Sequence, residues 1–402
     1  MAKEKKQPNS NLLGIIIPIC IAIAVVIGLA ISGKVTSNRD NVNPTVTVTK
    51  QAVSESVTEP QDSKVTIVAV GDNLIHNTLI DAGKQDDGSL DYSAFYENIS
   101  TYIKSADIAC INQETMLGGK DFEYQGYPMF NTPWEVGTAA INAGFDVFTC
   151  ATNHSLDVQK FAGIEKECEF FKKHPEVVHI GTNSTEEEYN TVTYYEKNGI
   201  KFALLNYTYG TNGISIPEDK PWCIDMLDED KVKADLKKAR ANADCVIVFP
   251  HWGTENSHEI NDLQKKYVKI FSDGGADIVI GTHPHVLQPV EWVTNEATGK
   301  RMIVYYSIGN FISHQTNLNQ MCGGMAELTV ERVDGKIQVT SAQLAPVVDF
   351  YRNTGNGYKF SVYRLSDYTD DIASEHAKDG ASVKYFTNLS KKIIGEEFLD
   401  LN

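Results

Sequence analysis

Short apolar segments that end in polar residues recur along the chain, and they restrict its fold more than any other feature. An acid, an amide or a histidine follows each of them, and the segments occupy residues 64–70, 106–111, 145–151, 244–249 and 276–280. Helix-forming segments, such as 134–143 and 263–273, separate several of them. Strands that alternate with helices favour a parallel or mixed sheet whose carboxyl-terminal edge gathers the connecting loops. The pattern therefore predicts an α/β domain with a polar cluster at one sheet edge.

The side chains that follow these segments are of the types that bind transition metals. The chain has ten histidines, and five of them, His76 included, come shortly after a predicted strand. Imidazole, carboxylate and amide groups together suit Zn, Mn or Fe better than Ca or Mg. Six or more ligands are too many for one catalytic ion but suit two. The candidate metal ligands are Asp72, Glu114, Asn153, His251, His283 and His285.

Some of these features also have a purely structural interpretation. Asp72 is either a metal ligand or the N-cap of the next helix. The aromatic loop 118–133 either lines a binding cleft or packs on the surface. His283 and His285 follow the predicted strand 276–280, and in an extended loop their rings would point to opposite sides, toward two neighbouring ions.

His154 directly follows the candidate ligand Asn153 at a strand end. If a helix begins near His154, Asp157 returns to the same side and can orient the imidazole ring. Adjacent residues do not easily fill the same role, so Asn153 can bind metal while His154 stays free beside it as a general acid. The alternative is that His154 caps a helix or packs against His251.

The amino-terminal region has the pattern of a membrane anchor. Three lysines precede an uncharged apolar run at 12–31, which is long enough to cross a bilayer as a helix. A cleaved signal peptide is the alternative. We predict an uncleaved single-pass anchor with its cationic end in the cytoplasm and the rest of the chain outside. The predicted division is an anchor at 1–33, a flexible linker at 34–62, a main domain at 63–345 and a carboxyl-terminal extension at 346–402 packed on it.

Charge limits the partners of the folded part. The formal net charge is −17, which argues against binding to nucleic acid. The cysteines do not form a recognisable disulfide framework.

Six short motifs, in order along the chain, resemble those of known families. The sequence Asp, acid, Asn-His, His, Gly-x-His-x-His is similar to that of the calcineurin-like metallophosphoesterase superfamily. The finer motifs resemble the poly-γ-glutamate capsule biosynthesis CapA family over roughly residues 64–345. They are Gly71-Asp72 with His76, Asn112-x-Glu114, Ala151-x-Asn153-His154-x-x-Asp157, His251-Trp252-Gly253-x-Glu255, Gly281-x-His283-Pro284-His285 and Ser307-x-Gly309-Asn310-Phe311.

The resemblance implies a metallophosphatase-like sandwich of two β-sheets flanked by helices, an α/β/β/α arrangement with metals at the sheet edge. By position, Asp72 and His285 would hold one ion, Glu114 would bridge, and the second ion would lie on Asn153, His251 and His283. His154 would protonate a leaving group, with Asp157 as its partner. Residues expected to surround the ligands or to touch substrate are His76, Asn112, Trp252, Glu255 and Asn310.

The function implied by the resemblance is synthesis or export of a poly-γ-glutamate capsule or polymer outside the membrane. The chain would be a metal-dependent hydrolase with a metal-activated water, working with proteins of a polymer synthesis and export complex. Its polymer would be polyglutamate or another cell-surface polymer. The alternative is a non-catalytic metal-binding scaffold of a polymer export complex.

Overall fold

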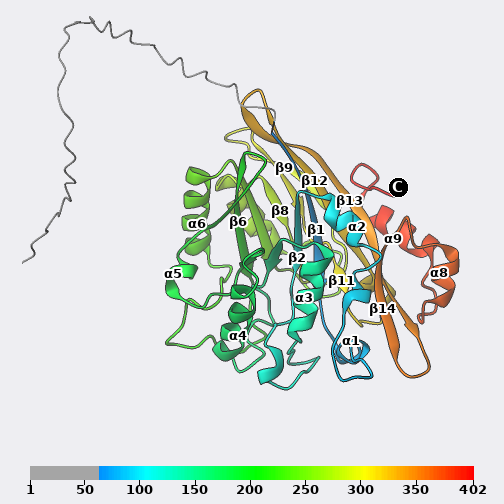
Figure 1. Cartoon of the computed structure of the whole chain (residues 1–402). Coiled ribbons are helices and arrows are strands. Elements are labelled where there is room, and N and C mark those ends of the chain that lie inside the picture. The colour runs from blue at the N-terminus through cyan, green and yellow to red at the C-terminus, as the bar shows by residue number, and fades with distance from the viewer. Residues whose placement is uncertain (1–62) are drawn as a thin grey trace, which may run out of the picture. The chain divides into compact units, whose positions relative to one another are not determined.

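The computed structural model describes residues 63–402, which contain two β-sheets and the helices around them (Figure 1). The eight-stranded sheet has the order β14 (Tyr358–Arg364), β13 (Lys336–Asn353), β12 (Cys322–Val333), β1 (Lys64–Asn73), β2 (Ile108–Asn112), β3 (Val147–Thr149) and β4 (Val178–Ile180), with β11 (Asn310–Ile312) paired to β1. The six-stranded sheet has the order β5 (Thr193–Lys197), β6 (Ile200–Thr208), β7 (Cys245–His251), β8 (Ile278–Ile280), β10 (Arg301–Tyr305) and β9 (Val290–Thr294).

Each sheet combines parallel strands with antiparallel strands, which lie at one margin of the eight-stranded sheet and at both margins of the six-stranded sheet. Strands β1 to β4 run parallel, and β12, β13 and β14 continue that sheet in antiparallel fashion. In the other sheet β6, β7, β8 and β10 run parallel. The central parallel strands are almost wholly buried, as their continuous apolar sequences require.

The main core fills the space between the two sheets. Successive side chains of a strand point to opposite faces, so Leu204 of β6 enters the core between the sheets while Leu205 faces outward. Leu205 packs in a second cluster with residues of α6 (Glu229–Asn242) and α7 (Asp262–Asp273).

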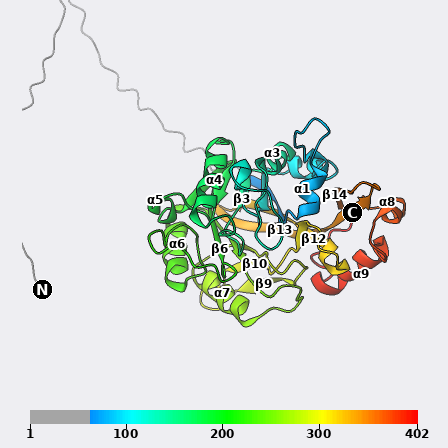
Figure 2. The same ribbon diagram turned by 90° about the horizontal axis from the view of Figure 1, so that it is seen from below.

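Helices cover the outer faces of both sheets. Figure 2 shows α1 (Asn77–Ala82) and α3 (Trp134–Ala143) on one side of the strands and α6 and α7 on the other. The expected layering of helix, sheet, sheet and helix is therefore present. The remaining helices are α2 (Ser100–Ser105), α4 (Phe161–Lys172), α5 (Glu186–Tyr189), α8 (Asp370–Glu375) and α9 (Val383–Ile394).

Several local predictions are confirmed. Helix α3 has the predicted bounds and ends at Gly144, whose φ of 112° is the left-handed geometry of a glycine C-cap. Helix α7, predicted at 263–273, begins one residue earlier, after a capping box between Asn261 and Gln264 that was not predicted. The Asn-Gly pair at 198–199 predicts a hairpin turn, and with φ of 49° and 74° it joins β5 and β6 as one.

Three possibilities that the sequence left open are excluded. Asp72 does not cap a helix, because β1 continues to Asn73 and the N-cap position of α1 is His76. No helix begins near His154, because turns extend to Phe161, where α4 starts. The His283–His285 loop is not extended, since its two histidines have φ of 96° and 60°.

The predicted anchor and linker, residues 1–62, lie outside the described residues. Between residues 63 and 402 no helix is both long and apolar enough to span a bilayer. The expected boundary at residue 345 falls inside β13, which pairs with β12 on one side and β14 on the other.

Candidate metal centre

The candidate ligands meet because parallel strands end at a common edge. Asp72 lies at the end of β1, Glu114 two residues beyond β2, and His251 at the end of β7. His283 and His285 lie in the loop that follows β8. The carboxyl ends of parallel strands point the same way, so these side chains converge at one end of the sandwich.

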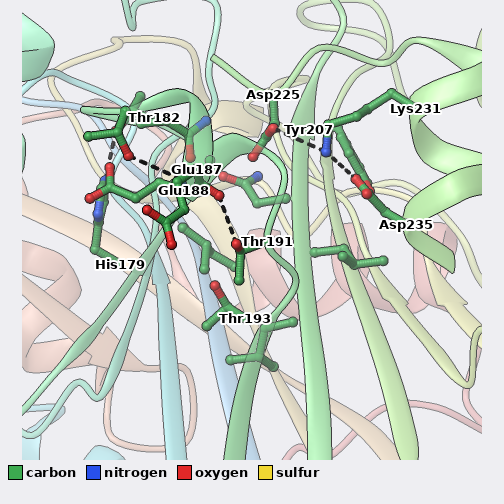
Figure 3. Close-up of a pocket in the computed structure, with 17 residues that line it drawn as sticks. His179, Thr182, Glu187, Glu188, Thr191, Thr193, Tyr207, Asp225, Lys231 and Asp235 are labelled. Carbon is green, nitrogen blue, oxygen red and sulfur yellow. Dashed lines mark hydrogen bonds and ion pairs between the residues drawn. The ribbon is translucent and has the colours of Figure 1, made fainter. Parts of the chain in front are cut away.

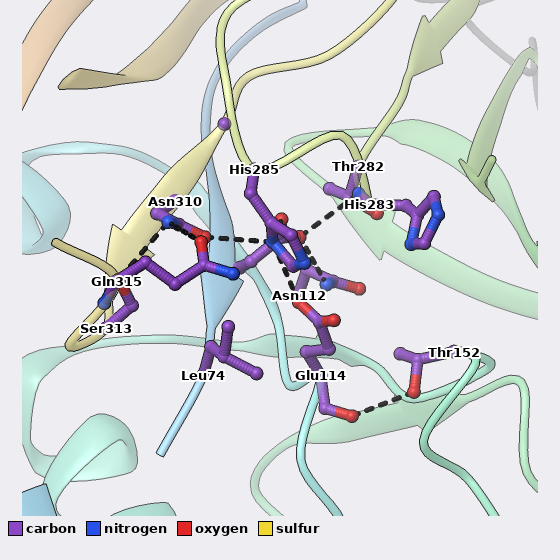
Figure 4. A network of polar contacts seen from close by, with 12 residues as sticks. Leu74, Asn112, Glu114, Thr152, Thr282, His283, His285, Asn310, Ser313 and Gln315 are labelled. Carbon is purple, nitrogen blue, oxygen red and sulfur yellow. Dashed lines mark hydrogen bonds and ion pairs between the residues drawn. The ribbon is translucent and has the colours of Figure 1, made fainter. Parts of the chain in front are cut away.

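Asp72, His285 and Asn310 form one side of the cluster. The Nδ1 atom of His285 lies 2.9 Å from Asp72 Oδ2 and 3.1 Å from Asn310 Oδ1. Both partners are acceptors, so Nδ1 carries a proton and donates to them, and in the neutral ring Nε2 keeps the lone pair that a metal ion would need. Asn112 fixes the other carboxylate oxygen by donating from Nδ2 to Asp72 Oδ1 at 2.9 Å. Figure 4 shows Asn310 on one side of His285 and Glu114 below it.

Asn153, His251 and His283 form the other side. His251 Nε2 lies 2.9 Å from Asn153 Oδ1, and Thr282 Oγ1 lies 3.0 Å from His251 Nδ1. The rings of His251 and His283 are 4.9 Å apart between centroids. His283 Nδ1 is buried and has no hydrogen-bond partner in the described part of the chain.

Glu114 lies between the two sides. Its Oε2 is 3.7 Å from His285 Nδ1, and its Oε1 is 3.8 Å from His251 Nε2. Both oxygens are buried, and within residues 63–402 neither has a hydrogen-bond partner. A buried polar atom without a partner costs about 1–3 kcal/mol, and more when it is charged. One donor atom of each of Glu114, His283 and His285 lies within 4.8 Å of the others. The unpaired atoms of Glu114 and His283 could therefore share a bound cation with His285.

The pKa values of the residues in the cluster also fit a bound cation. Burial raises the pKa of Glu114 well above 4.5, and His285 offsets only part of this effect. Burial also lowers the pKa values of His251 and His283 well below 6.5, so both rings are neutral and can act as metal ligands. Burial alone would lower the pKa of His285, but the carboxylates of Glu114 and Asp72 raise it to about 9.

His154 and Asp157 form the predicted pair beside the cluster. His154 Nδ1 lies 2.6 Å from Asp157 Oδ2, and that oxygen also accepts from Phe130 N–H at 2.8 Å. The carboxylate therefore holds the proton of the imidazole on Nδ1 and leaves Nε2 for another partner. The ring of Phe130 packs edge-on against His154, with centroids 4.7 Å apart, so the loop 118–133 lies next to the candidate centre.

Of the other residues expected around the ligands, Asn112 and Asn310 lie in the cluster, and His76 and Glu255 lie around it. Asn112 and Asn310 contact the cluster directly, as described above. His76 packs against Phe130 at 5.4 Å and accepts from the backbone N–H of His314. Glu255 is exposed, and its charge helps to raise the pKa of His285.

Trp252 does not join the cluster. Its side chain is fully buried in the core under α6 and α7, where its Nε1–H donates to the carbonyl of Tyr306 at 2.9 Å. It follows His251 directly, and consecutive residues of an extended segment point to opposite faces.

Three residues at the centre were not predicted. Thr282 bonds His251, and the ring of Tyr209 lies 4.5 Å from that of His283. Asn212 contacts both Asn153 and His154, at 3.2 and 3.4 Å. Tyr209 and Asn212 follow β6, so the strand-end pattern that identified the other ligands would have indicated this segment too.

Fold and site together define an α/β sandwich protein with a candidate metal centre at its strand ends. A model of the family described as bacterial capsule synthesis protein PGA_cap matches residues 66–315, and the chain belongs to this family.

Two curated relatives carry related descriptions. "PGA biosynthesis protein CapA" of Bacillus subtilis (strain 168) is 31% identical over 172 residues, which cover 42% of this chain and 43% of that protein. "Capsule biosynthesis protein CapA" of Bacillus anthracis is 26% identical over 322 residues, which cover 78% of this chain and 71% of that protein.

Among solved structures, the calcineurin-like phosphoesterase YfkN of Bacillus subtilis is similar with a TM-score of 0.40 and 15% sequence identity. That match covers 83% of this chain and 97% of the other. A likeness this distant transfers no activity to the present chain.

Proposed function

We propose that the chain is a metal-dependent hydrolase of metallophosphatase type that acts in the synthesis or export of a poly-γ-glutamate capsule or related cell-surface polymer. The observation that carries the proposal is the position of Glu114, whose two unpaired oxygens face His285 on one side and His251 on the other. Membership of the capsule synthesis family supplies the biological setting.

Two divalent ions, of Mn, Zn or Fe, fit this donor set. Asp72 and His285 would hold one, Asn153, His251 and His283 the other, and Glu114 would bridge. Bound ions of this kind supply Lewis acidity and a nucleophilic water at neutral pH. Imidazole nitrogens with carboxylate and amide oxygens are the ligands expected for such metals.

The chain itself supplies proton transfer and orientation. Asp157 keeps the His154 proton on Nδ1, so Nε2 of the protonated ring can donate to a leaving group. Asn212 accepts from Asn153 Nδ2 at 3.2 Å through its Oδ1 and lies beside the ring of His154, so one side chain contacts both a proposed ligand and the proposed acid. Asn310 and Asn112 orient His285 and Asp72 in the same manner.

The second candidate is a non-catalytic metal-binding scaffold within a polymer export complex. It is favoured by the descriptions of the family and of both curated relatives, which name capsule or PGA biosynthesis and no reaction. In either case we propose that the chain is attached to the cell membrane by residues 12–31, with the folded part outside. Its partners there would be the other proteins of the synthesis and export complex.

The direct test is metal analysis of the purified protein, with turnover assays on polyglutamate and on model phosphate esters. We expect bound Mn, Zn or Fe, and His283→Ala should lose most of it because the buried Nδ1 of His283 has no hydrogen-bond partner in the part of the chain that the structure describes. His258→Ala is the matched control, since His258 bonds the Leu287 carbonyl outside the cluster. Equal metal content in the two variants, or metal-free wild-type protein after growth with all three metals, would contradict the proposal.

A further inference from the structure

A cavity lies away from the candidate metal centre, and none of the residues of that centre lines it. Its volume is about 570 Å³, a size typical of sites for small molecules. The segment after β4, helix α5, strand β6 and helix α6 contribute its walls. Strands β4 and β5 are the edge strands of the two sheets, so the cavity lies at an open side of the sandwich. Figure 3 shows its lining.

A charged network forms one wall of this cavity. The Lys231 ammonium contacts the Asp235 carboxylate closely and lies 3.8 Å from Asp225 Oδ1. Tyr207 donates its hydroxyl to Asp235 Oδ2 at 3.1 Å. Asp235 therefore has two close partners, whereas Asp225 Oδ1 is buried and has no hydrogen-bond partner within the described chain. In Figure 3 the Asp225 carboxylate points into the cavity.

The lining has more negative than positive charge. Lys231 is its one cationic side chain, and it is shared by Asp225 and Asp235. Two further carboxylates, Glu187 and Glu188, lie exposed at the mouth. Burial lowers the pKa of His179, also in the lining, to about 4, so this ring adds no positive charge. An anion would be repelled here, and a cation attracted.

The type of cation follows from the shape and the neighbours. A bare Ca²⁺ or Mg²⁺ ion requires about six or more oxygen ligands at close range, and any divalent cation would be repelled by the adjacent Lys231 ammonium. The cavity is also far larger than an ion. Threonine and asparagine side chains, among them Thr182, Asn183 and Thr193, line the rest of it. They suit a molecule that carries hydroxyl, amide or further amine groups.

We propose that this cavity binds a small hydrophilic molecule through a protonated amine that pairs with Asp225. The amine would donate a hydrogen bond to Oδ1, whose nearest cation is Lys231 at 3.8 Å, and would balance the excess of carboxylates. Strand β6 connects the two sites: Asn206 in the cavity wall accepts from the N–H of Ala151, two residues before Asn153, and Tyr209 just beyond the strand contacts His283. An occupant of the cavity therefore touches a segment that helps to position the metal centre.

The test uses a matched series of four-carbon probes on the purified full chain: putrescine, 4-aminobutan-1-ol, 1,4-butanediol and succinate. Titration calorimetry at pH 8 keeps Asp225 ionised, because burial raises its pKa to about 7. We expect the two amines to bind, and the diol and the dicarboxylate to bind at least tenfold more weakly. The proposal is overturned if the diol or succinate binds as tightly as the amines, or if Mg²⁺ binds the cavity in preference to them.

Two variants test whether the amine probes bind in this cavity. Asp225→Asn should weaken putrescine binding by at least about 30-fold, the loss expected when one partner of a buried charge pair is removed. Thr191→Trp should also block binding, because it fills the mouth while leaving Asp225 in place. Asp230→Asn, an exposed acid on α6 outside the cavity, is the control and should bind normally. Undiminished binding by a folded Asp225→Asn protein with normal metal content would exclude the site.

Discussion

At the scale of single residues, the candidate centre depends on which atoms remain without partners. Asp72, Asn153 and His251 are each hydrogen-bonded in the cluster, whereas two oxygens of Glu114 and one nitrogen of His283 have no hydrogen-bond partner among residues 63–402. A structural role would favour full pairing, because each buried unpaired group costs free energy. The unpaired atoms face a common space, which is the arrangement that a metal site requires.

Substitution of His154 distinguishes the hydrolase hypothesis from the scaffold hypothesis. We expect His154→Ala to keep the fold and the bound metal but to lose about 10²–10⁴-fold in turnover, because a general acid typically contributes that much. Asp157→Asn should have a smaller effect of the same kind, since it disturbs the proton on Nδ1. The measurement is turnover together with polymer production in a deletion strain, at matched protein level. Full restoration of polymer by His154→Ala would leave only the scaffold function.

At the scale of elements, the cluster depends on how closely β11 approaches β1. Asp72 N–H donates to the carbonyl of Gly309 at 3.0 Å, and Asp72 is in register with Asn310. This approach is possible because residue 71 has no side chain. A Cβ atom on Gly71 would lie 1.8 Å from the Gly309 carbonyl oxygen. The glycine is therefore a condition for bringing Asp72 and Asn310 to the same histidine.

We expect Gly71→Ala to lower the free energy of unfolding by about 1–3 kcal/mol, the usual cost of forcing an atom into a packed site. It should also reduce metal binding, since Asp72 is the next residue. Chemical denaturation and metal analysis measure the two effects. Gly210→Ala is the control, because a Cβ there meets nothing within 4 Å and should change stability by less than about 0.5 kcal/mol. Similar results for both variants would show that the close approach does not matter.

At the scale of the whole molecule, buried carboxyl groups make stability depend on pH. Burial raises the pKa of Asp349 from 3.8 to about 8 and that of Glu167 from 4.5 to about 7. In the folded protein these groups stay protonated while in the unfolded chain they ionise. Their contribution to stability is therefore full below about pH 4 and is lost as the pH rises toward 8.

Asp349→Asn should remove the part of the pH dependence of stability that comes from residue 349. At pH 8 we expect the variant to be more stable than the wild type, by an amount on the order of a few kcal/mol, because an amide has no charge to bury. At pH 4 the two proteins should differ little. Denaturant unfolding at several pH values measures the difference. A variant that is less stable than the wild type at pH 8 would mean that the Ser313 hydrogen bonds to Asp349 require the carboxylate.

The location of the whole chain is open to a separate test. If residues 12–31 anchor it with the folded part outside, protease added to cells stripped of their wall should remove residues 63–402 and leave a small membrane-bound fragment. A cytoplasmic protein examined in parallel should stay intact. Complete protection of the folded part in intact cells would contradict the proposed topology.

Much of this architecture could be predicted from the sequence because its signals are local. Apolar runs, glycine turns and helix caps indicated the strands and helices, including α3 with its Gly144 cap, and the strand-end pattern indicated six candidate ligands that the structure brings to one edge. These signals depend on neighbouring residues and on the side-chain period of each element. The pairing of His154 with Asp157 was also predicted, although turns rather than a helix bring the two together.

Only the tertiary structure decided which of these side chains face one another. Trp252 follows His251 but points into the outer core, whereas Tyr209 and Asn212, which follow β6, contact the residues of the centre. The cavity beside Asp225 likewise draws its walls from segments distant in sequence. Local sequence determines what each element is and where it ends, whereas the direction of a buried side chain depends on packing between elements that the chain brings together only on folding.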